Sequence, residues 1–137
     1  MWARIHPSGA LAAVAALALL ASGCGSGGTL SAKALSQESK SLQSLAAEGA
    51  LLARDSAAGR TTGTFTRVHS EDLYKAASKS ATSLQSAKTA PPLEPKLEQT
   101  ASAASKVSAD LKRLGHASTV EQRRLARELE AIARELA

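Results

Sequence analysis

Apolar residues recur along much of this sequence at alternating steps of three and four, the spacing that collects them on one face of a helix. The pattern covers residues 31–54, 70–89, 95–114 and 119–136, with Pro92–Pro95 opening the third stretch. The stripes consist mainly of leucine and alanine, and the period-two alternation of strands is almost absent. The sequence therefore predicts four amphipathic helices.

Residues that favour helix ends support these boundaries. Ser70 precedes two acidic residues, an arrangement that favours the start of a helix. Ser118 and Glu121 have the spacing of a capping box, and Gly115 suits a left-handed helix end. Residues 55–67 are rich in polar residues and glycine, so we expect them to form a loop.

The remaining connections are short, which forces consecutive helices to lie antiparallel. The predicted fold class is therefore all-α, an antiparallel up-down four-helix bundle over residues 31–137. Many inward positions hold alanine or serine, so the helices should approach closely and leave little room for a large ligand. An alternative arrangement has three antiparallel helices, with the first helix loose or paired with a second copy.

The first 24 residues have a different pattern. Arg4 is followed by an uninterrupted apolar run at 10–21 and then by Ser22-Gly23-Cys24. As a helix, this run would span about 18 Å, which is well short of the roughly 30 Å of a bilayer core. A charged start, a short apolar run and small residues are typical of a secretory signal.

The ending at Ser22-Gly23-Cys24 resembles the lipobox of bacterial lipoproteins, although Ala21 stands where that family prefers leucine. The resemblance implies that residues 1–23 are a signal peptide and that Cys24 becomes the acylated first residue of the mature chain. Two acyl chains anchor a protein stably, whereas a single chain binds reversibly. The resemblance to lipoproteins also implies that the protein is anchored on the extracytoplasmic face of the cell membrane, or on the outer membrane of a host with two membranes.

Residues 24–30 then form a lipidated cysteine and a Gly/Ser-rich tether. The five residues of 25–29 have a root-mean-square span of about 12 Å by the scaling of such linkers. We therefore expect the helical domain to sit close to the bilayer.

The composition of the mature chain restricts its chemistry. Removal of residues 1–23 takes away one basic residue, Arg4, which leaves 16 basic and 12 acidic residues and a net charge of +4. Cys24 is the only cysteine, so no disulfide can form within the chain. Despite the positive charge, we expect no nucleic acid as a partner, because an exported protein does not meet the genome.

Antiparallel helices bring His69 and His116 to the same end of the bundle, with Asp55, Asp72 and Glu121 nearby. Imidazole and carboxylate groups are ligands of zinc and copper. However, no closely spaced histidine pair is present, and both histidines fall at loop edges. We therefore predict solvated histidines and no metal site.

One acidic residue lies on the inward stripe of the first predicted helix, where apolar side chains are expected. Glu38 falls between Leu35 and Leu42 on the inward stripe, which predicts a structural ion pair, a rim position at the membrane-facing end, or a polar core position with a functional carboxylate.

Arg123, Arg127 and Arg134 lie within about 40° of one another, opposite the leucines of the last helix. Such a strip suits anionic lipid head groups or wall phosphates. Glu130 lies in the same strip and is spaced to pair with Arg127 and Arg134, which favours an ordinary solvated face.

No motif for catalysis is present: the sequence has no nucleophile elbow, no glycine-rich phosphate loop and no paired histidine ligands. We therefore expect no enzyme and no cofactor beyond the lipid on Cys24. The predicted function is a membrane-anchored, non-catalytic interaction module, a monomer or weak homo-oligomer that contacts an envelope protein or an anionic wall polymer. The alternative is a carrier of a small ligand or metal, using the bundle core or the end with His69 and His116.

The metal prediction has a direct test. Calorimetric titration with zinc and copper is expected to show no binding tighter than about micromolar, since two ligands at loop edges leave a zinc site half filled. A tighter one-to-one isotherm that His69→Ala or His116→Ala abolishes would favour the carrier instead.

Overall fold

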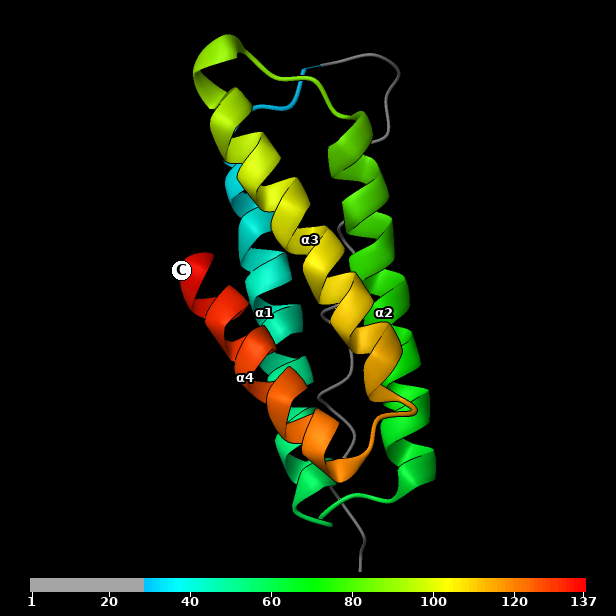
Figure 1. Ribbon diagram of the computed structural model, residues 1–137. Coiled ribbons are helices and arrows are strands. Elements are labelled where there is room, and N and C mark those ends of the chain that lie inside the picture. The colour runs from blue at the N-terminus through cyan, green and yellow to red at the C-terminus, as the bar shows by residue number, and fades with distance from the viewer. Residues whose placement is uncertain (1–28) are drawn as a thin grey trace, which may run out of the picture.

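The computed structural model describes residues 29–137, which form four α-helices and no β-strand (Figure 1). The helices are α1 (Ala32–Ala57), α2 (Gly63–Ser86), α3 (Glu94–Leu114) and α4 (Thr119–Glu135), with a short 3₁₀ helix, η1 (Pro91–Leu93), before α3. The all-helical prediction is confirmed. The predicted signal peptide and Cys24 lie outside the described residues. Within 29–137, no helix is both long and apolar enough to span a membrane.

The second helix begins earlier than the sequence predicted, at Gly63 instead of Ser70. Thr62 caps it, since its side chain accepts a hydrogen bond from the backbone N–H of Phe65 at 3.2 Å. The predicted loop over 55–67 is therefore wrong, and the turn between α1 and α2 covers only residues 58–62.

Polar residues at buried positions account for the error. Thr66 and Ser70 are both buried and continue the inward stripe of α2 without an apolar side chain. Their hydroxyl groups donate to backbone carbonyls of the preceding turn, Thr66 to Thr62 at 3.1 Å and Ser70 to Arg67 at 3.1 Å. The burial therefore leaves no hydrogen-bonding group unsatisfied, but it conceals the helical period in the sequence.

The predicted start of α4 is confirmed, but the predicted conformation of the glycine after α3 is wrong. Ser118 caps α4 and accepts a hydrogen bond from the N–H of Glu121 at 3.4 Å, as predicted. Gly115 is not left-handed, because its φ is −60°. Gly115 instead allows a close approach, since a Cβ atom there would lie 2.9 Å from the hydroxyl oxygen of Ser70, which would have to move. The left-handed glycine is Gly59, with a φ of 70° in the turn after α1.

Successive helices run in opposite directions, and they pack as two close pairs (Figure 1). One pair is α1 with α4, the other is α2 with α3, and the two pairs pack on each other as two layers. Because α4 is the shortest helix, it covers only part of α1, and the rest of the bundle consists of α1, α2 and α3.

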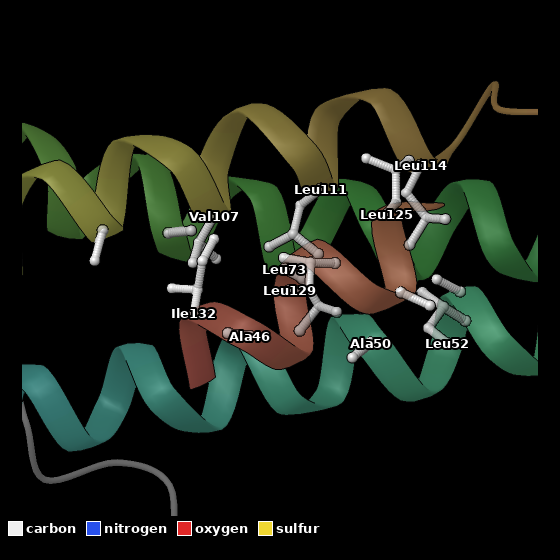
Figure 2. Close-up of a cluster of buried hydrophobic side chains, with 14 residues drawn as sticks. Ala46, Ala50, Leu52, Leu73, Val107, Leu111, Leu114, Leu125, Leu129 and Ile132 are labelled. Carbon is white, nitrogen blue, oxygen red and sulfur yellow. The ribbon is translucent and has the colours of Figure 1, made fainter. Parts of the chain in front are cut away.

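The core has two parts that follow this division. Where all four helices meet, Leu111, Leu125 and Leu129 are fully buried against small residues of α1 (Figure 2). Among these small residues is Gly49, where a Cβ atom would lie 2.6 Å from a δ-carbon of Leu111. In the three-helix part, the larger Leu35 of α1 fills the core instead, together with the residues Leu42, Leu84, Leu97 and Ala104.

The start of the described chain is fixed at one end of the bundle. The N–H of Leu30 donates to the carbonyl of Lys88 at 2.6 Å, and the hydroxyl of Thr89 donates to the carbonyl of Leu30 at 3.0 Å. We call this the entry end, because the predicted tether reaches the bundle here. The opposite end, with the turns at 58–62 and 115–118, is the far end.

The buried leucines give a test of this core. In residues 29–137 expressed alone, Leu111→Ala and Leu129→Ala should each lower the free energy of unfolding by about 2–5 kcal/mol, because they leave cavities. The same substitution at Leu51, which is 56% exposed, serves as the control and should change it by no more than about 0.5 kcal/mol. Denaturant unfolding followed by circular dichroism measures all three. Equal losses at buried and exposed leucines would contradict the described packing.

Candidate functional site

Near the far end of the bundle, a hydrogen bond between side chains links α1 and α2, and an aromatic ring stacks beside it. His69 of α2 and Glu48 of α1 are joined by a hydrogen bond of 2.8 Å between Nε2 and Oε1. The Phe65 ring lies one helical turn before His69 and stacks on its imidazole, with centroids 5.5 Å apart and an interplanar angle of 24°. Phe65 is nevertheless 53% exposed, and Val68 beside it is 56% exposed. These residues form a fixed aromatic site on the surface.

The structure does not bring together the residues weighed in the sequence as candidate metal ligands. His69 is engaged with Glu48, while His116 is exposed in the turn between α3 and α4. Asp55 accepts a hydrogen bond from Arg60 at 3.0 Å, and Glu121 pairs with arginines of α3 and α4. Within the described part of the chain, no three His, Cys, Asp or Glu residues form a group that could hold a metal ion.

Glu38 lies at the border between α1 and α2. It is partly buried, and its carboxylate accepts a hydrogen bond from the hydroxyl of Ser80 in α2. The neighbouring Ser39 is the buried polar residue at this level, and its hydroxyl lies 3.5 Å from the carbonyl oxygen of Leu136. The structure therefore gives Glu38 a neutral hydrogen-bonding partner between helices.

The three arginines of the predicted strip on α4 are all exposed. Within residues 29–137, none of Arg123, Arg127 and Arg134 forms an ion pair. Glu130 does not pair with Arg127 or Arg134, as its spacing suggested, because it faces α1 and pairs with Arg54 at 3.5 Å. The strip therefore retains its positive charge.

A buried carboxylate lies between α3 and α4, and the pattern of apolar residues did not predict it. Asp110 is only 7% exposed, and its nearest cationic group is the guanidinium of Arg113 at 3.5 Å. Burial raises the pKa of Asp110 above its ordinary value, and the charge of Glu128 adds to the effect, while Arg113 and Arg124 oppose it. Its position three residues after Val107, on the inward stripe of α3, was the available signal.

An open groove lies beside the end of α4, where that helix stops short of the entry end. Its volume is about 540 Å³, and it is bordered by η1, the start of α3 and the last residues of the chain. The lining combines Pro92 and Leu136 with the polar Lys96 and Gln99. This mixed and open surface does not enclose a ligand.

Comparison with protein-family models, with curated proteins and with solved structures finds no match for this chain. The chemistry of its own residues is therefore what supports a function. An exposed phenylalanine stacked on a hydrogen-bonded histidine suits contact with another protein, because aromatic residues are enriched in such interfaces.

Asp110 gives a prediction on pH. Because its pKa is raised in the folded protein, the folded state retains the proton at a higher pH than the unfolded state does. The free energy of unfolding therefore falls as the pH rises through the range above about 3.9, the ordinary value of aspartate. Asp110→Asn should make the protein more stable than the parent at pH 7, with the advantage shrinking towards pH 4.

Thermal unfolding at several pH values measures this difference. Asp72→Asn makes the same substitution at an exposed position and should show no comparable pH dependence. A loss of stability in Asp110→Asn at pH 7 would show that the pairing with Arg113 outweighs the cost of burial.

Proposed function

We propose that this protein is a non-catalytic helical module, anchored through a lipid on Cys24 to the extracytoplasmic face of a cell membrane. Its helices form an antiparallel up-down bundle behind a lipoprotein signal peptide. The module contacts another protein of the envelope through the exposed aromatic site at Phe65 and Val68.

The anchor is supported by the order of residues at the start of the chain. Arg4, the apolar run at 10–21 and Ser22-Gly23-Cys24 resemble the start of bacterial lipoproteins. The hydrogen bonds of Leu30 at the entry end agree with a tether that joins the bundle there. The far half of the bundle, with Phe65, then extends away from the attachment point.

The exposure of Phe65 is the observation that supports protein contact most directly. It is the only phenylalanine in the chain, yet more than half of its surface faces solvent, at 53%. Aromatic side chains contribute large buried areas to interfaces. Because the ring is already held against His69, and His69 against Glu48, a partner would lose little rotational freedom in binding it.

The anchor is tested by mass spectrometry of the protein purified from membranes. The mature chain should begin at Cys24 and carry a diacylglyceryl group, and Cys24→Ser should abolish both the cleavage and the adduct. An unmodified mature chain that begins at any other residue would contradict the anchor.

The contact is tested by placing a photoreactive phenylalanine analogue at position 65 in cells. We expect one discrete crosslinked product, which Val68→Asp should abolish by placing a charge in the interface. The same analogue at Ala109, an exposed position of α3, is the control and should give no such product. Equal crosslinking from positions 65 and 109 would contradict a specific site.

A further inference from the structure

The outer side of the layer formed by α1 and α4 is strongly basic. Its six exposed basic residues are Lys33, Lys40, Arg54, Arg123, Arg127 and Arg134, and we call this surface the basic face. On α1, Lys33 and Lys40 lie within about 20° of one another, on the side opposite the buried stripe. Since α1 and α4 are closely paired, these residues and the arginines of α4 belong to one surface.

Most acidic residues of the same two helices are engaged by residues outside the basic face. Glu38 and Glu48 bind residues of α2, and Glu121 pairs with Arg113 of α3. Asp55 accepts a hydrogen bond from Arg60, Glu128 pairs with Arg124, and Glu130 pairs with Arg54, while Glu135 is exposed near the end of α4. The segregation leaves the face with an excess of positive charge.

Two large apolar side chains are exposed on the same surface. Leu51 is 56% exposed and lies within about 20° of Lys33 and Lys40 around α1. Val120 is 77% exposed and lies within about 60° of the arginines around α4. Basic residues interspersed with exposed aliphatic side chains are typical of helices that lie in the interface of an anionic membrane.

We propose that the basic face docks on an anionic lipid bilayer, so that the anchored bundle lies flat on the membrane. The proposal rests on the lipid anchor proposed above, which brings the bundle to the bilayer. Each Lys or Arg near an anionic leaflet favours association, so the five basic residues of this face other than Arg54 supply a substantial attraction. The layer of α2 and α3 then faces away from the membrane and leaves Phe65 and Val68 accessible.

A bilayer fits this surface better than a soluble polyanion does. A polyphosphate polymer would satisfy the basic residues, but it offers no apolar region for Leu51 and Val120. A bilayer offers both anionic head groups and hydrocarbon just beneath them. The predicted tether of five residues keeps the face within reach of the membrane.

The test uses the acylated protein with one added cysteine, Leu51→Cys, reconstituted in vesicles of phosphatidylcholine alone or mixed with phosphatidylglycerol. The lipid blocks the sulfur of Cys24, so a water-soluble thiol reagent reacts only at position 51. We expect the reaction to be about tenfold slower on the phosphatidylglycerol vesicles and to recover in high salt, since salt screens the attraction.

Two controls separate docking from a general effect of the vesicles. Ala109→Cys places the thiol on the outer side of α3, at a similar distance from the far end, and should react equally on both vesicles. In the Leu51→Cys background, Arg123→Gln, Arg127→Gln and Arg134→Gln together should remove the slowing, because each base contributes about fivefold. The matched set Lys75→Gln, Lys79→Gln and Lys106→Gln, on α2 and α3, should preserve it.

Equal reaction of Leu51→Cys on both vesicles would overturn the proposal. So would an equal slowing by soluble polyphosphate on phosphatidylcholine vesicles, because the partner would then be a polyanion. Flotation with phosphatidylcholine vesicles tests the anchor separately, since only the lipid supports it. If the anchor fails, flotation of residues 29–137 alone with phosphatidylglycerol vesicles still tests the basic face: binding supports the proposal, and its absence overturns it.

Discussion

The size of the side chains along α1 determines where a fourth helix can pack. In the half of α1 that faces α4, the inward positions are small except for Leu52, namely Ala46, Gly49, Ala50 and Ala53, and the leucines of α3 and α4 fill the space beside them. In the other half, Leu35 and its neighbours fill the core themselves, and three helices are enough. The short α4 therefore packs along the part of α1 whose inward side chains are mostly small. The length of α4 corresponds to the length of that part.

Much of the helical architecture could be predicted from residue periodicity, because leucine stripes report which side of a helix is buried. The start of α2 could not, since Thr66 and Ser70 occupy buried positions with hydroxyl groups that bond to their own helix. A period based on apolar residues cannot detect such positions. Gly115 was assigned to the wrong role for a related reason, because its close contact with Ser70 depends on tertiary packing.

The surface chemistry was predictable in part. The arginine strip of α4 follows from helical spacing alone, but the direction of Glu130 does not, because its partner Arg54 belongs to another helix. The stacking of Phe65 on His69 was hidden by the misplaced loop, which removed both residues from a common helix face. Pairwise contacts between helices depend on rotation and register, which single-sequence patterns determine only loosely.

The pairing of the helices also has a consequence for the order of folding. The close pair α2 and α3 joins neighbours in the sequence, and a short connection closes it at little entropic cost. The close pair α1 and α4 joins the first helix to the last, with two helices between them. Contacts of this kind form slowly, so the hairpin of α2 and α3 is expected to form first and to serve as the surface on which α1 and α4 assemble. We therefore expect the contacts of Gly49 with Leu129 of α4 to form after the hairpin of α2 and α3.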